Sequence, residues 1–304
     1  MSSAEQTGPG TPYPFLKGHG TENDFVLLPD HDGSLHGRLE DERVRALCDR
    51  RAGIGGDGVL RVIRTEALAR VTDDAALTEQ RAEWFMDYRN ADGSVSEMCG
   101  NGIRVFGRHL VEAGLADPSG PVPVGTRDGV KVLTFAEGAA DGEITVDMGA
   151  PRILGQTSVA IGEQSWAALG VDMGNPHAVA FLGADQDLAA VGPLLAPPDH
   201  DEAFYPDGVN VEFVVRRGER HVAMRVHERG SGETRSCGTG ACAVMVATAL
   251  ADGAAGGAAG GAGVRGTPYR IDLPGGTLRI TWTAEDRILM AGPAILVAQG
   301  NTTL

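Results

Sequence analysis

Lysine is almost absent from this chain of 304 residues. Only Lys17 and Lys131 occur, and the other basic residues are arginines. An enzyme that binds an aldehyde cofactor needs a lysine for its Schiff base. Lys131 stands in a stretch that alternates like a strand and Lys17 lies next to a loop, so neither has the context of a cofactor site.

Long apolar runs and a basic surface are also missing. No apolar run approaches the length that spans a bilayer, and the polar start lacks the basic-then-apolar pattern of a secretory signal. We therefore expect a cytoplasmic protein with a disordered leader over residues 1–13 and no membrane partner. The formal net charge is -15, which argues against a nucleic-acid partner because a phosphate backbone needs a basic face. A small zwitterionic ligand responds to local charges and is still compatible.

The chain has four cysteines, which a cytosolic protein keeps as reduced thiols. Their spacings do not resemble a four-ligand zinc site, and no metal is expected. Cys48 and Cys242 fall on apolar faces of expected helices and are interpreted as small core residues. Cys99 and Cys237 have glycine-rich surroundings and are the candidates for chemistry.

Periodicity predicts a mixed α/β (α+β) chain with two domains. Strand-like or apolar segments cover residues 25–28, 59–63, 83–88, 130–135, 143–148, 178–182, 209–215 and 222–226, and further short strands are expected from 269 to 297. Helices are expected over 40–51, from 103 to about 111, and from 242 onward. The composition of residues 117–123 is typical of a linker.

The two halves repeat one plan. In each, strands lead to a Cys-Gly-x-Gly turn, at Cys99 or Cys237, and the turn leads into a helix. The two cysteines are 138 residues apart. This pattern favours an internal duplication, weak in identity and clear in architecture.

A cysteine at a helix start is suited to proton transfer. The unpaired N–H groups and the macrodipole favour negative charge there, so we expect a lowered thiol pKa. The glycines leave the following N–H groups open to a substrate carboxylate. With two such starts, one thiolate removes a Cα proton and the other thiol delivers one to the opposite face, without a metal or cofactor.

At these residues the chain resembles the diaminopimelate epimerase family. The matching stretches keep the family's order: residues 19–25, 90–94, 98–102, 173–177, 208–210 and 228–242. The resemblance implies two similar domains, each a barrel-like mixed sheet around a central helix, with the active site in the interdomain cleft. It also implies conversion of LL-2,6-diaminopimelate to the meso isomer, in lysine and cell-wall precursor biosynthesis, and a homodimer.

Residue roles follow from the matching motifs. The resemblance implies that Cys99 and Cys237 are the acid/base pair and that His177 and Glu228 tune the thiol pKa values. The implied substrate contacts are Asn23, Asn90, Asn175, Asn210, Glu228 and Arg229, with Gly100, Asn101, Gly238 and Thr239 as the helix-start donors.

The chain departs from the family pattern in a few places. Gly58 stands where some members have a substrate-contacting Gln, so that contact is lost or supplied elsewhere. Thr239 replaces Ser and keeps the hydroxyl. The Gly/Ala loop over residues 253–263 is an expected local addition. We divide the chain into domains over 14–124 and 125–286, with a final strand at about 287–299 returning to the first.

Four other hypotheses stay open. A proline racemase-like enzyme shares the fold and the paired cysteines, but the Asn23, Asn175, Asn210 and Arg229 set favours a longer substrate with two polar ends. An isomerase of the phenazine type shares the architecture and needs no pair of thiols. A thiol–disulfide protein is disfavoured because a close Cys-x-x-Cys pair is missing. A binding module without catalysis is the remaining possibility.

Overall fold

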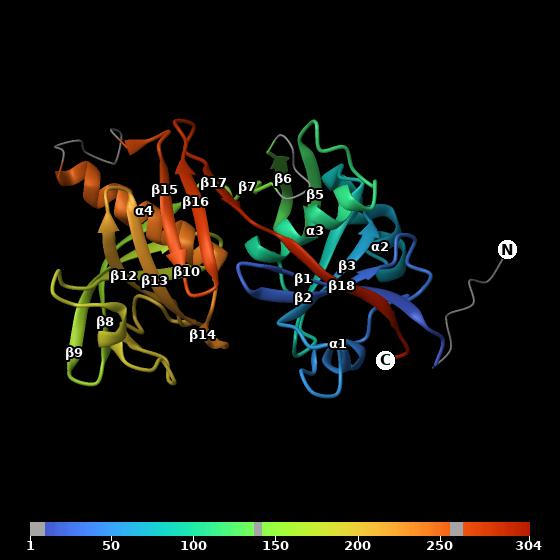
Figure 1. Ribbon diagram of the computed structural model, residues 1–304, viewed down its shortest axis with the longest axis horizontal. Helices are drawn as coiled ribbons and strands as arrows, with labels where there is room; N and C mark the ends of the chain where they lie inside the picture. The colour runs from blue at the N-terminus through green and yellow to red at the C-terminus, as the bar shows by residue number, and fades with distance from the viewer. Residues whose placement is uncertain (1–9, 137–141, 256–263) are drawn as a thin grey trace. The chain divides into compact units, whose positions relative to one another are not determined.

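The computed structural model describes residues 10–136, 142–255 and 264–304. Most of the expected leader and of the expected Gly/Ala loop therefore lies outside the described residues. The chain forms two compact units, which are treated separately below: unit 1 comprises residues 1–146 and 293–304, and unit 2 comprises residues 147–292. Figure 1 shows the elements of both units.

Unit 1 is a mixed sheet with a helix packed inside it. Its strands are β1 (Tyr13–Gly20), β2 (Asn23–Pro29), β3 (Gly58–Arg64), β4 (Trp84–Asn90), β5 (Val122–Thr126), β6 (Gly129–Phe135), β7 (Ile144–Asp147) and β18 (Ile295–Thr302). The order is β18-β1-β2-β3-β4-β5-β6-β7, with parallel pairs only at β2–β3 and β4–β5. The strand β18 comes from the end of the sequence and pairs with β1 (Figure 1).

The central helix of unit 1 is α3 (Gly100–Glu112), whose residues from Gly100 to Leu110 are all buried. It contacts β1, β2, β3, β4 and β18, so strands cover it on several sides. Two short helices, α1 (Asp41–Cys48) and α2 (Thr65–Thr72), and the 3-10 helix η1 (Ala75–Gln80) complete the unit. Val44 and Leu47 of α1 pack against Val26 of β2 in a separate apolar cluster.

Unit 2 repeats this arrangement. Its main strands are β8 (Arg152–Ile161), β9 (Gln164–Asp172), β10 (Pro176–Phe181), β12 (Asn210–Gly218), β13 (His221–Glu228), β15 (Pro268–Leu273), β16 (Gly276–Trp282) and β17 (Ile288–Gly292). Short pieces are β11 (Asp199–His200), β14 (Gly232–Thr234) and η2 (Leu188–Val191). The order is β8-β9-β10-β12-β13-β15-β16-β17, with parallel pairs only at β10–β12 and β13–β15.

The central helix of unit 2 is α4 (Gly238–Ala255). Its residues from Ala241 to Ala249 are buried on every face, which is the mark of a helix enclosed by other elements. It contacts β9, β10, β12, β13, β15, β16 and β17. Both units thus enclose one helix in a sheet with the same sequence of parallel and antiparallel pairs, and the expected fold class of two similar mixed domains is confirmed.

Some expected details differ from the structure. The expected linker at 117–123 overlaps β5, whose Val122 and Pro123 pair with β6. The division between the units falls after residue 146 rather than after 124. Tyr13, the last residue of the expected leader, begins β1 and is buried.

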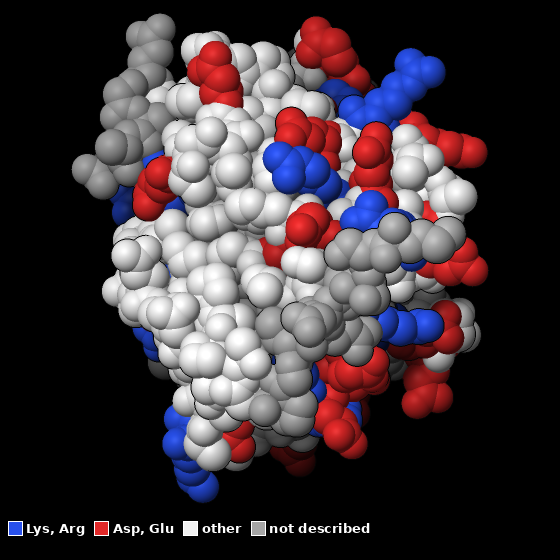
Figure 2. Space-filling view, turned by 90° about the vertical axis from the view of Figure 1, so that its right-hand side faces the viewer, with Lys and Arg blue, Asp and Glu red and all other residues white. Residues whose placement is uncertain are grey.

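The surface has charges of both signs. On the face drawn in Figure 2, Lys and Arg side chains lie interspersed with Asp and Glu and are separated by uncharged surface. No helix in the described part of the chain is long and apolar enough to cross a membrane.

Candidate active site

Cys99 caps the central helix of unit 1. It occupies the N-cap of α3 in an extended conformation, and the Gly102 amide donates a hydrogen bond to its Sγ at 3.4 Å. A sulfur in this place satisfies one of the unpaired first-turn donors of the helix. The side chain is partly exposed, so the thiol lies at the edge of the core rather than inside it.

Asn23 lies beside this thiol. The Cys99 Sγ is 3.7 Å from the Asn23 Oδ1, which also accepts from Asn101 Nδ2 at 3.2 Å. Arg104, fully buried, donates to the Asn101 Oδ1 at 2.8 Å and to the Gly100 carbonyl at 3.0 Å. Asn23, Gly100 and Asn101 are therefore brought together with Cys99, as the family motifs implied.

A strained turn sets the position of Asn23. Thr21 and Glu22 both have left-handed backbone angles, with φ of 50° and 61°, and connect β1 to β2 as a two-residue hairpin turn that usually uses Asn or Gly. Such angles cost free energy in a β-branched residue. They place Asn23 at the first position of β2, next to the helix start.

Asn90 and Gly58 face each other at the ends of β4 and β3. Asn90 Nδ2 donates to Ser94 Oγ at 3.0 Å, within its own turn. A Cβ at Gly58 would lie 2.5 Å from the Arg89 carbonyl oxygen, so a Gln does not fit here on this backbone. The neighbouring Asp57 was not singled out from the sequence, and it accepts from Asn23 Nδ2 at 2.7 Å.

Cys237 stands before the central helix of unit 2 in the same way. The Gly240 amide is 3.3 Å from its Sγ, and Thr239 Oγ1 is 3.5 Å from it. Gly238 opens the helix, so the two helix-start residues expected in this unit are beside the thiol. Unlike Cys99, Cys237 is buried, with 5% of its surface exposed.

Glu228 ends β13 and reaches the same thiol. The Thr234 hydroxyl and the Cys237 thiol both hydrogen-bond its carboxyl group. Burial raises the pKa of Glu228 above its usual value, and these hydrogen bonds oppose the rise. The expected closeness of Glu228 to the thiol is thus present within unit 2.

The pKa of Cys237 moves in the direction opposite to our expectation. Burial raises it well above its usual value, and the charges of Glu228 and Glu212 raise it further. The hydrogen bonds from Thr239 and Gly240 lower it but do not compensate. Desolvation of a thiolate beside two carboxyl groups outweighs the helix start, so Cys237 carries its proton in this state.

His177 lies between two side chains. Its Nδ1 is 2.6 Å from Glu212 Oε1 and its Nε2 is 3.0 Å from Asn175 Oδ1. His177 and Glu212 are both fully buried. Glu212 was missed from the sequence, although a charged residue at an inward position of an otherwise apolar strand is an available signal for a special role.

Asn210 and Arg229 lie at the start of β12 and after the end of β13. Asn210 donates to the Pro176 carbonyl at 2.9 Å and accepts from the Arg229 amide at 3.0 Å. The Arg229 side chain is exposed and donates to the Asp207 carbonyl at 2.9 Å. Asn210 therefore orders the backbone that presents Arg229.

Two further observations concern cysteines and metals. Cys48 and Cys242 are buried, in keeping with a core role. Within the described ranges, no three His, Cys, Asp or Glu side chains are grouped so that they could hold a metal ion.

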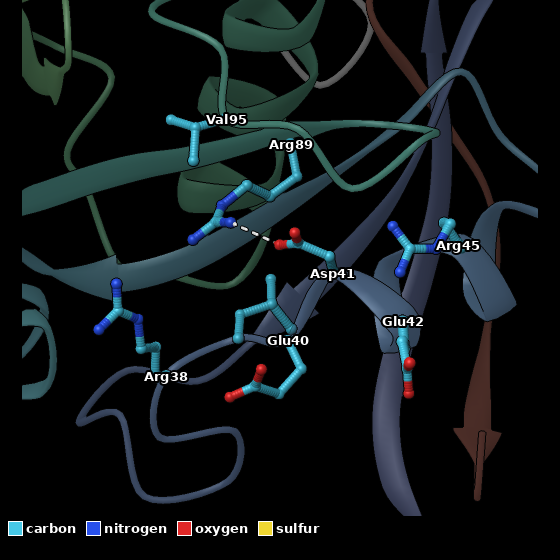
Figure 3. Close-up of a pocket in the computed structure, with 8 residues that line it drawn as sticks. Arg38, Glu40, Asp41, Glu42, Arg45, Arg89 and Val95 are labelled. Carbon is cyan, nitrogen blue, oxygen red and sulfur yellow. Dashed lines mark hydrogen bonds and ion pairs between the residues drawn. The ribbon is translucent and has the colours of Figure 1, made fainter.

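A surface hollow of about 570 Å³ lies elsewhere in unit 1 (Figure 3). Arg89 lines it and forms an ion pair with Asp41 at 3.5 Å. The remaining lining side chains are mostly charged, with Arg38 and Arg45 near Glu40 and Glu42. None of the expected site residues lines this hollow.

Comparisons with known proteins show the family of the chain. The family model described as diaminopimelate epimerase matches residues 15–154 and 169–297. A diaminopimelate epimerase of Streptomyces coelicolor is 56% identical, over 94% of this chain and 94% of its own length. One of Thermobifida fusca is 46% identical, over 95% and 98%.

Solved structures resemble the chain in fold. A probable proline racemase of Agrobacterium radiobacter aligns with a TM-score of 0.65 at 14% identity, over 95% of this chain and 92% of that one. A phenazine biosynthesis protein of Bacillus anthracis aligns with a TM-score of 0.62 at 14% identity, over 96% and 99%. These likenesses concern the fold, whereas the sequence match extends over nearly the whole chain, and the protein belongs to the diaminopimelate epimerase family.

Proposed function

We propose that the chain epimerises LL-2,6-diaminopimelate to the meso isomer by proton transfer between two cysteines. The observation that carries the proposal is the repeated geometry: in each unit a cysteine thiol caps the buried central helix and accepts from the amide three residues on. Family membership supplies the substrate class. The reaction needs both thiols at one carbon, from opposite faces.

The two thiols have different roles in a given direction. Cys237 carries a proton in the free protein, because burial and two carboxyl groups hold its pKa high. It is therefore the proton donor when Cys99 takes the Cα proton. In the reverse direction Cys237 becomes the base and Cys99 the acid, as a reversible two-base reaction requires.

The carboxylate next to the reacting carbon binds the helix starts. Gly100 and Asn101 in unit 1, and Gly238 and Thr239 in unit 2, stand at first-turn positions. Amides in such positions bind anions and stabilise the negative charge that develops when the proton leaves.

Polar side chains recognise the rest of the substrate. Asn23, Asn90, Asn175 and Asn210 are proposed amide contacts, and the exposed Arg229 binds a carboxylate. A bidentate guanidinium is suited to that task. The chemistry uses no cofactor, and the chain is proposed to act in the cytoplasm as a homodimer, in lysine and cell-wall precursor biosynthesis.

Solvent isotope exchange tests the proposal. The reduced protein is incubated in D2O with LL-diaminopimelate, and the product is analysed by chiral chromatography and mass spectrometry. We expect meso product with one deuterium at the inverted carbon. Racemisation of L-proline without turnover of diaminopimelate would transfer the assignment to the proline racemase type, whose fold the chain shares.

Oxidation separates the epimerase from a thiol–disulfide protein. A disulfide would remove both bases, so we expect activity to fall when the protein is oxidised and to return with a reductant. Activity that appears only after oxidation would contradict the proposed mechanism.

A further inference from the structure

The repeated fold allows the surroundings of the two cysteines to be compared position by position. In unit 1, Phe25 of β2 pairs with Gly58 of the parallel strand β3. In unit 2, His177 of β10 pairs with Asn210 of the parallel strand β12. Two residues further along the second strand of each pair stand Leu60 and Glu212, which are therefore equivalent.

Two glycines support this equivalence independently. A Cβ built on Gly102 would meet Leu60 Cδ2 at 3.1 Å and Cys99 Cβ at 3.4 Å. A Cβ built on Gly240 would meet Glu212 Oε1 at 2.6 Å and Cys237 Sγ at 3.2 Å. Each cysteine thus packs next to a first-turn glycine and the equivalent strand residue.

The two environments differ in charge. In unit 1 the equivalent pair is apolar, Phe25 and Leu60, and both are buried. In unit 2 the pair is His177 and Glu212, joined at 2.6 Å. Unit 1 has a leucine at this position, so packing alone does not require the carboxyl group of Glu212 in unit 2.

Burying the Glu212 carboxyl group has a cost. The residue is completely enclosed, and its Oε2 atom has no hydrogen-bond partner among the residues that the structure describes. A carboxylate in such a place is costly even with one good partner. Groups of this kind concentrate at functional sites.

We propose that Glu212 is a positioning residue of the Cys237 half: its carboxylate orients the His177 ring toward Asn175 and keeps Cys237 in the thiol form. The inference rests on the proposed function, in which Cys237 exchanges a proton with the substrate. Through His177, Glu212 sets the direction of the Asn175 amide. Its charge adds to the effects of burial and of the Glu228 charge, which together keep Cys237 protonated in the resting enzyme.

The groups that face Cys237 come from several elements. Glu228 of β13 and Glu212 of β12 contribute negative charge, and Thr239 of α4 contributes a hydroxyl. His177 of β10 acts through both carboxyl groups, because it pairs with Glu212 and its charge lowers the pKa of Glu228. Glu212 is thus one of two carboxyl groups whose removal should make the thiolate easier to form.

The rate of alkylation of Cys237 measures how easily its thiolate forms, and the measurement needs no turnover of substrate. We compare the native chain, Glu212→Gln and Glu212→Leu, with Glu219→Gln as the control that removes an exposed carboxylate of the same unit. Iodoacetamide is the probe, at several pH values between 7 and 9.5, and modification is localised to Cys237 by fragment mass spectrometry. Only the thiolate reacts.

The two variants separate the orientation of His177 from the effect of the Glu212 charge on Cys237. Glutamine keeps an acceptor oxygen for His177 and loses the charge, whereas leucine, the residue of unit 1, loses both. We expect alkylation of Cys237 at a given pH to become about tenfold faster in both variants, which corresponds to about one unit of pKa. We expect the KM for diaminopimelate to rise markedly only in Glu212→Leu.

Several outcomes would overturn the inference. One is an alkylation rate within twofold of the native chain in both variants while circular dichroism shows an intact fold. Another is an equal rise in KM in both variants. If neither variant folds, the carboxyl group serves the fold itself and the inference is wrong.

The test is independent of the proposed activity. A native chain that does not turn over diaminopimelate would remove the proposed function, while a faster alkylation of Cys237 in the variants would still support the charge effect of Glu212. An active native chain with unchanged alkylation in the variants would leave the proposed function in place and remove this inference.

Discussion

Glu212 in unit 2 and Leu60 in unit 1 occupy equivalent strand positions, and each packs against the first-turn glycine of a helix capped by a cysteine. The two halves therefore share the geometry that holds the thiol and differ in the charge around it. A two-base enzyme gains from this difference, because its two thiols must be in opposite protonation states when the substrate arrives.

The substitution Leu60→Glu tests this difference in charge by placing a carboxyl group at the equivalent position of unit 1. The new carboxylate would lie beside Phe25, which offers no counterpart to the His177 imidazole. We expect the free energy of unfolding to fall by about 3 kcal/mol or more, since an unpaired charge would be buried. Urea unfolding measures this, with Leu60→Met as the volume-matched control. A loss similar to that of the control would contradict the apolar surroundings described for Leu60 and Phe25.

The first-turn glycines give a matched pair of variants. In Gly240→Ala the new methyl group would collide with the Glu212 carboxyl group, whereas in Gly102→Ala it meets a leucine methyl at a tight but adjustable distance. We expect Gly240→Ala to lose about 1–3 kcal/mol of stability together with most of the turnover. We expect Gly102→Ala to stay within about 1 kcal/mol, because alanine favours the helix. Equal losses in both would argue against the close Glu212 contact.

Removal of either thiol tests the two-base mechanism. We expect Cys99→Ala and Cys237→Ala each to abolish epimerisation while circular dichroism and the melting temperature stay close to those of the native chain. Cys48→Ala, which removes a buried thiol outside the site, is the control and should keep its turnover. Substantial epimerisation by either single variant is the result that the mechanism does not allow.

Two buried histidines make stability depend on pH. Burial lowers the pKa of both His36 and His109 to about 4. The unfolded chain binds protons at these residues below about pH 6.5 and the folded chain does not. Stability is therefore fully present above that pH and is lost as the pH falls toward 4, by about 2–3 kcal/mol for each histidine.

Urea unfolding of the whole chain at pH 7 and pH 5 measures this loss of stability. We expect His109→Leu to reduce the difference in stability between the two pH values, because one titrating group is removed, whereas Leu60→Met, which removes no titrating group, leaves it unchanged. If the difference is the same in the native chain and in His109→Leu, the lowered pKa of His109 is not the cause.

Much of the fold could be predicted from the sequence. The apolar segment over residues 209–215 and the helical spacing of apolar residues around Met245 indicated β12 and α4, and the structure buries both on all sides. The Cys-Gly-x-Gly turns located both helix starts. The limit between the units was harder, because β5 begins inside a stretch whose Pro and Gly content is typical of loops.

The site was predicted unevenly. The family motifs indicated that Asn23 and Glu228 lie near the two thiols. They did not indicate the burial and the Glu212 carboxyl group that keep Cys237 protonated. Glu212 lies 25 positions before Cys237 in the sequence, and only the pairing of β10 with β12 brings it to His177. The direction of the thiol pKa depends on burial, which a motif does not reveal.

The pairing of β18 with β1 has a consequence for biosynthesis of the chain. The ribosome delivers Ile295–Thr302 only after all of unit 2, yet these residues complete the sheet that begins at Tyr13. Until then β1 exposes an unpaired edge, which is a known route to aggregation. Unit 2 is contiguous in sequence, whereas the half that holds Cys99 is complete only when the last strand of the chain has paired with the first.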